Sequence, residues 1–97
     1  MTDFQRKLFE KFPQLPWIGD ITKEELAKHN KKEDCWCSFQ GYVYDLTSYL
    51  SYHPGGILSI MEYAGDDMTS GYMKWHSYIP PTIFEKLKIG KIVIKEK

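Results

Sequence analysis

The chain has 97 residues, which is enough for one small domain. Hydrophobic residues make up 42% of the chain and aromatic residues 15%, which indicates a globular fold and excludes a disordered one. The 13 basic and 13 acidic side chains cancel, and no basic stripe interleaved with aromatic residues is present, so the composition argues against a nucleic-acid-binding protein.

Residues 1–16 form an N-terminal extension to a domain that we place at residues 17–94, with residues 95–97 as a tail. Pro13 and Pro16 end a pattern of large apolar residues at near-helical spacing, namely Phe4, Leu8, Phe9 and Phe12. This pattern predicts a short amphipathic helix packed on the domain. A helix that lies on a membrane surface or docks a partner is the alternative.

A capping-box pattern marks the first helix of the domain. Thr22 can accept an early helix N–H, and Glu25 can reach back to the cap. We expect this helix to run to about His29, where a cation suits the helix dipole. His29 is therefore assigned a structural role.

Two short strands are predicted on either side of Gln40-Gly41, over residues 35–39 and 42–45. Cys35 and Cys37 stand two residues apart on the first of them and would share one face. Two cysteines are too few for a disulfide scaffold, and no Cys-x-x-Cys-His motif for covalent haem attachment is present.

Helical signals dominate the second half of the chain. Thr47 can cap a short helix over residues 48–52, and further helical stretches are expected at residues 57–64, ended by Gly65, and at residues 68–74. Pro80-Pro81 opens another helix, whose core-facing residues would be Ile83, Phe84 and Leu87, before a closing strand or tail with Ile89, Ile92 and Ile94. The expected fold class is a small α+β domain.

His53-Pro54-Gly55-Gly56 and His76-Ser77 carry the strongest functional signal. Two helical stretches and a turn separate the two histidines, so the helices can form a V that holds a flat haem between imidazoles on its two faces. Gly55 and Gly56 would let the backbone approach the ring. The alternatives are surface histidines in plain loops, and a zinc module that combines both histidines with the two cysteines.

From Ile21 to Ile92 the sequence resembles the cytochrome b5 haem-binding domain. The matching pieces are Lys28-His29-Asn30, Trp36, residues 41–47, Tyr49-Leu50, residues 53–56, Ala64-Gly65, Asp67, Thr69, His76-Ser77 and Ile89-Gly90. The resemblance implies a short mixed sheet with helix pairs that form a haem pocket, and a non-covalent haem b. The chain around Trp17-Ile18 and the short interval between the histidines look most like the haem domain of soluble cytochrome b5/b5 reductase fusion proteins.

The resemblance also implies which residues form the site. His53 and His76 would be the axial iron ligands, and Ser77 would bond a haem propionate. The residues implied as pocket lining are Phe39, Leu46, Tyr49, Leu50, Ile60, Tyr72 and Ile83, with Gly55 and Gly56 close to the ring. Ordinary core packing is the alternative for the apolar members of this set.

The implied function is one-electron transfer, because two histidine ligands leave no open position on the iron. The domain would not be an enzyme by itself, although it could be the haem domain of a larger oxidoreductase. It would accept electrons from a flavin-containing reductase and pass them to a redox acceptor protein. A haem-binding sensor or storage module is the alternative.

We expect a monomer in the cytoplasm, because no apolar run approaches the length of a membrane helix and the N-terminus lacks the apolar core of a signal peptide. The domain could also face the cytosol from an anchored or multidomain parent.

Overall fold

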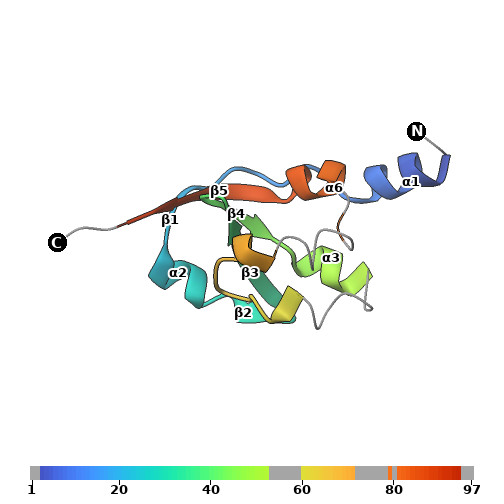
Figure 1. Cartoon of the computed structure of the whole chain (residues 1–97). Helices are drawn as coiled ribbons and strands as arrows, with labels where there is room; N and C mark the ends of the chain where they lie inside the picture. Colours follow the sequence, from blue (N-terminus) through green and yellow to red (C-terminus); the bar gives the residue numbers. More distant parts are fainter. Residues whose placement is uncertain (1–2, 53–59, 72–78, 80, 95–97) are drawn as a thin grey trace.

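The computed structural model describes residues 3–52, 60–71, 79 and 81–94 (Figure 1). Its helices are α1 (Asp3–Lys11), α2 (Lys23–Ala27), α3 (Thr47–Tyr52), the 3₁₀ turn η2 (Thr69–Gly71) and α6 (Pro81–Lys86). Its strands are β1 (Gly19–Thr22), β2 (Asn30–Lys31), β3 (Asp34–Phe39), β4 (Tyr42–Asp45) and β5 (Lys88–Val93).

The strands form one mixed sheet in the order β1-β5-β4-β3-β2. β1 pairs with β5 in parallel, whereas the other neighbours are antiparallel. Strand β4 pairs with β3 on one side, where Cys37 lies opposite Tyr44, and with β5 on the other, where Val43 lies opposite Gly90, so β4 is central. Val43 and Tyr44 are adjacent in β4, so their side chains point to opposite faces of the sheet. The predicted α+β class with a short mixed sheet is confirmed.

Alternation along the strands divides the core into two clusters. The main core cluster comprises Phe12, Cys35, Cys37, Tyr44, Leu46, Tyr49, Leu50, Ile60, Met68, Ile79, Ile83, Phe84 and Leu87. The second core cluster, on the other face, comprises Ile21, Leu26, Val43 and Ile89, with Trp36 packed against it. The two cysteines therefore share a face, as predicted, and that face is the one that the helices of the second half cover.

The β3–β4 hairpin follows the predicted pattern. Gln40 and Gly41 both have positive φ values, of 50° and 89°, which is the geometry of the tight turn that matches strand twist. Because the turn holds the register, Phe39 pairs with Tyr42 at its base.

Helix α2 starts as predicted and ends early. The Thr22 hydroxyl accepts the N–H of Glu25 at 3.1 Å, so the cap is confirmed. The last turn tightens, because Lys28 donates to the Glu25 carbonyl and His29 to the Leu26 carbonyl, three residues back in each case. The predicted end near His29 is wrong, since the helix stops at Ala27 and the His29 carbonyl accepts the N–H of Trp36 in the sheet.

Helix α3 begins one residue before the predicted start. Thr47 is its first residue, and the Asp45 carboxylate accepts the Thr47 N–H at 3.1 Å. The Thr47 hydroxyl accepts the N–H of Cys35 at 2.9 Å, which ties the start of α3 to strand β3.

The next two helices were predicted over residues 57–64 and 68–74. Residues 57–59 of the first and 72–74 of the second lie outside the described residues. In the described part, helix at Ile60 and Met61 gives way to tight turns before Gly65, whose φ is 75°. The start of the 68–74 stretch is the short 3₁₀ turn η2 and not an α-helix. Helix α6 begins at Pro81, and the predicted core residues Ile83, Phe84 and Leu87 are confirmed as buried.

Strands β1 and β2 were not predicted. Both are short, and β2 is fully exposed, so neither carries an alternating apolar pattern. Strand β1 forms by pairing with β5, which is distant in sequence, and β2 forms by pairing with β3 across a turn. Strand β1 approaches β5 so closely that a Cβ on Gly90 would overlap the carbonyl oxygen of Gly19.

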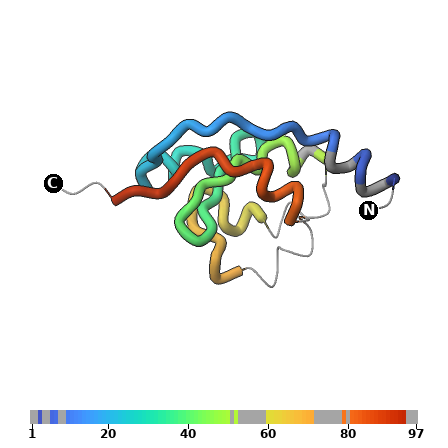
Figure 2. Tube along the Cα trace, turned by 90° about the horizontal axis from the view of Figure 1, so that it is seen from above, coloured from blue at the N-terminus to red at the C-terminus, as the bar shows by residue number. Residues whose placement is uncertain are grey.

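The N-terminal extension contains the predicted helix, α1, and then runs beside α6 and β5 (Figure 2). Leu15 N–H donates to the Lys86 carbonyl at 2.9 Å, and Ile18 N–H donates to the Ile89 carbonyl at 2.7 Å. Phe12 is 4% exposed and belongs to the main core cluster. Burial of such a side chain contributes about 1.5–3 kcal/mol. Within the described part of the chain, no helix is long and apolar enough to cross a membrane.

Candidate functional site

Six of the predicted pocket residues lie in the described part of the chain, and the fold brings them together. Leu46, Tyr49, Leu50, Ile60 and Ile83 all belong to the main core cluster, and each is at most 1% exposed. Phe39 packs against the same cluster, with its ring edge-on to that of Phe84 at 5.7 Å. The other predicted site residues, His53, Gly55, Gly56, Tyr72, His76 and Ser77, lie outside the described residues.

The described residues that flank the two histidine-bearing stretches meet in the same cluster. The first stretch follows Tyr52, which packs against the main core cluster, and ends at Ile60, which belongs to it. The second stretch follows Gly71, which is buried against the Tyr63 ring, and ends at Ile79, which is 1% exposed in the main core cluster. Both stretches therefore begin and end against one apolar region, which suits a large apolar cofactor.

Aromatic residues that were not predicted as part of the site extend this region. Tyr44 stacks on Phe84, with ring centroids 3.8 Å apart and planes 12° apart. Burial raises the pKa of Tyr44 and that of Tyr49 to about 12, in keeping with their place in the main core cluster. The alternation of side chains along β4 could have indicated Tyr44 from the sequence, because Tyr44 lies opposite Cys37 on the same face of the sheet.

The burial of both cysteines and the protonation of Cys37 argue against a zinc site. Both are completely buried free thiols, and the Cys37 thiol donates to the Tyr63 carbonyl at 3.2 Å. Hydrogen bonding with Cys35 and burial raise the pKa of Cys37, which keeps its thiol protonated, whereas zinc binds the thiolate.

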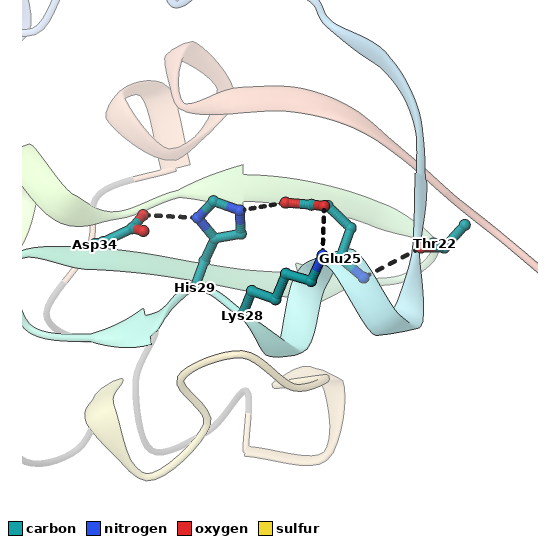
Figure 3. Close-up of polar contacts among 5 residues, drawn as sticks. All are labelled: Thr22, Glu25, Lys28, His29 and Asp34. Carbon is teal, nitrogen blue, oxygen red and sulfur yellow. Dashed lines mark hydrogen bonds and ion pairs between the residues drawn. The ribbon is translucent and has the colours of Figure 1, made fainter.

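His29 lies between the carboxylates of Asp34 and Glu25 (Figure 3). Its Nδ1 lies 2.7 Å from Asp34 Oδ1 and its Nε2 lies 2.8 Å from Glu25 Oε2, while its ring stacks on Trp36 at 3.5 Å. The predicted structural role agrees with this position, but two carboxylates, and not the helix end, stabilise the cation. The Glu25 carboxylate contacts His29 and Lys28, in place of the predicted contact with the cap.

We expect this cluster to make stability depend on pH. Burial lowers the pKa of His29, but the hydrogen bonds to Asp34 and Glu25 outweigh it, and the net shift is upward. The stabilisation is complete below the ordinary histidine pKa of about 6.5 and is lost as the pH rises through the raised folded value. For a partly exposed cluster the loss should be on the order of 2–4 °C in Tm.

The measurement is thermal unfolding of the wild type and His29→Gln between pH 5.5 and 8.5. The wild type should lose more stability than the variant across this window. NMR titration of the His29 ring protons gives the folded pKa directly. Identical pH profiles for the two proteins, or a His29 pKa below its ordinary value, would contradict the prediction.

Residues 22–93 match the cytochrome b5-like heme/steroid binding domain family. Cytochrome b5 reductase 4 of Xenopus tropicalis is 44% identical over 77 residues, and that of Homo sapiens is 39% identical over 77 residues. The match covers 78% of this chain and 15% of each reductase. An uncharacterised protein of Schizosaccharomyces pombe is 52% identical over 59 residues, which cover 61% of this chain and 40% of that protein.

Solved structures have the same fold. Cytochrome b5 of Ostreococcus tauri virus 2 has a TM-score of 0.62 and 37% identity, over 76% of this chain and 96% of that one. Cytochrome b558 of Ectothiorhodospira vacuolata, described as a prokaryotic homologue of cytochrome b5, has a TM-score of 0.62 and 31% identity, over 74% of this chain and 95% of that one.

The mixed sheet with an apolar cluster against one face, taken with these similarities, identifies a small haem-binding electron-transfer module. The chain belongs to the cytochrome b5 family. Its cofactor is haem b. The chain spans 40% of the Schizosaccharomyces pombe relative and 15% of the reductases that it matches.

Proposed function

We propose that this domain is a one-electron carrier in which His53 and His76 ligate the iron of haem b on opposite faces. Bound in this way, haem b supplies a reversible one-electron couple without an open coordination position. We propose the pocket lining to be the predicted set, with Tyr72 and the two glycines of His-Pro-Gly-Gly beside the ring and Ser77 at a propionate.

One observation carries the proposal. Three of the described residues that flank the histidine-bearing stretches, Tyr52, Ile60 and Ile79, belong to or pack against the main core cluster, which also contains five of the predicted lining residues. The fourth, Gly71, lies against the Tyr63 ring, which packs on the same cluster. Tyr52 immediately precedes His53, and Ile79 follows His76 by three residues. Described residues near each proposed ligand are thus held against the same apolar region, and the six described lining residues are of the apolar and aromatic kind that a haem pocket needs.

The proposal extends to partners and location. The similarity to cytochrome b5 reductase 4 supports a flavin-containing reductase as electron donor, either as a separate protein or as another part of a longer chain. The acceptor would be a redox protein. We further propose residues 17–94 as the functional unit, a monomer in the cytoplasm or on the cytosolic side of an anchored or multidomain parent.

An absorption spectrum of the purified protein, recorded oxidised, reduced and reduced under carbon monoxide, tests the function. A bis-histidine carrier should show sharp reduced bands that carbon monoxide leaves unchanged, because no coordination position is open. Carbon monoxide binding in the wild type would reject the bis-histidine carrier in favour of a haem sensor. A colourless, zinc-loaded protein would reject haem binding altogether.

A further inference from the structure

The N-terminal segment, residues 3–16, lies before the start of the family match at residue 22 and yet contributes to the main core cluster. Among its described residues, Phe12 belongs to that cluster and Leu15 packs against it. The Phe12 ring lies 5.4 Å from that of Tyr49 and 5.5 Å, edge-on, from that of Tyr52. Both tyrosines belong to α3, and Tyr52 is the residue immediately before His53.

A second contact holds the same point of α3. The Lys11 ammonium lies 4.5 Å from the centre of the Tyr52 ring, an arrangement in which a cation is attracted to an aromatic face. Between the segment and α3 lies a hollow of about 390 Å³, lined by Lys11, Phe12, Pro13, Leu15, Ser48, Tyr52 and Leu87. The segment therefore contacts α3 through side chains, and two of these contacts are made with Tyr52, the last residue of the helix.

The segment also contacts the helix on the other side of the site. The Leu15 N–H donates to the carbonyl of Lys86, the last residue of α6. Helix α6 follows the stretch that contains His76, and it contributes Ile83 to the main core cluster. One segment thus joins the helix before the first histidine to the helix after the second.

We infer that residues 3–16 brace the haem site, and that Phe12 is a positioning residue that acts through Tyr52 on His53. The inference rests on the proposed role of His53 as an iron ligand. Partners that orient an axial ligand control how tightly the metal is held and what electronic state it adopts. Without the Phe12 ring, the end of α3 would gain freedom to move into the hollow, and this freedom would pass to His53, the next residue in the chain.

The test compares three variants of the full-length holoprotein. Phe12→Ala removes the ring, and Phe12→Leu keeps apolar bulk. Leu26→Ala is the matched control, because Leu26 is 3% exposed, close to the 4% of Phe12, but belongs to the second core cluster on the other face of the sheet. The measurements are the rate of haem transfer to apomyoglobin and the electron paramagnetic resonance g values of the oxidised haem, which report imidazole orientation.

Phe12→Ala should lose haem about tenfold faster than the wild type, which corresponds to about 1.4 kcal/mol, and should show shifted g values. Phe12→Leu should lie between Phe12→Ala and the wild type. Leu26→Ala should melt at a lower temperature but keep wild-type g values and haem loss.

Equal acceleration of haem loss by Phe12→Ala and Leu26→Ala, with unchanged g values, would overturn the inference and leave Phe12 a purely structural role. If Phe12→Ala does not fold, the test rests on Phe12→Leu. A rate of haem loss and g values of Phe12→Leu identical to those of the wild type would then overturn the inference. A wild-type protein without a low-spin bis-histidine signal would instead overturn the proposed function. A low-spin wild type with unaffected Phe12 variants would overturn this inference alone.

Discussion

Replacing either His53 or His76 with alanine should abolish the low-spin bis-histidine spectrum. The variant should release haem or hold it with one open axial position that carbon monoxide can occupy. Changes to residues that only orient a metal ligand cost about 10–100-fold in affinity, so loss of the ligand itself should cost more. The measurements are haem affinity by titration of the apoprotein and the absorption spectrum with and without carbon monoxide.

The third histidine provides the control. His29 is held by Asp34 and Glu25 and stacks on Trp36, and it lies in neither of the two histidine-bearing stretches. His29→Gln should therefore keep the wild-type spectrum and haem affinity. Unchanged low-spin spectra in both His53→Ala and His76→Ala would show that neither residue ligates the iron.

Removal of haem should lower the melting temperature by roughly 15–30 °C. A ligand that binds only the folded state stabilises it by about 4 kcal/mol at a thousand times its dissociation constant, and 1 kcal/mol shifts Tm by about 4–8 °C in a domain of this size. The structural reason is that haem would add apolar contacts to the main core cluster, which holds the predicted lining residues Leu46, Ile60 and Ile83, and its removal takes those contacts away.

The loss should be uneven along the chain, and amide hydrogen exchange can measure it. The second core cluster, around Ile21, Leu26 and Val43, does not include any predicted haem contact and should keep its protection. Residues 53–84 should exchange faster in the apoprotein than in the holoprotein. Equal melting temperatures of the two forms, or equal protection across residues 53–84, would contradict this prediction.

Local signals were sufficient for much of the fold. Thr22 forms its predicted cap with a residue three positions away, and Gln40-Gly41 forms its turn within a hairpin, because each interaction closes over a few residues. Pro81 begins a helix for the same reason. The apolar residues of that helix could be assigned to the core from spacing, although spacing cannot separate core from haem lining.

For the candidate site, the order of motifs around His53 and His76 was sufficient to indicate the family and the cofactor, because chemically distinctive residues recur there at characteristic intervals. The tertiary structure added the grouping of six predicted lining residues in one place. It also showed that Tyr44, Met68 and Phe84 belong to the same cluster. Contacts of this kind join residues far apart in sequence.

The sequence by itself determined the α+β class, the cytochrome b5 family and the elements with strong local signals. Only the tertiary structure decided that β1 pairs with β5, that His29 lies between two carboxylates, and that Phe12 packs on α3. The physical reason is distance along the chain. A cap or a tight turn is stabilised by its own neighbours, whereas a parallel strand pair and a docked N-terminal segment form only once the sheet has brought their distant partners together. The carboxylate partners of His29 are only four and five residues away, but they reach its ring because the chain turns between α2 and strand β3.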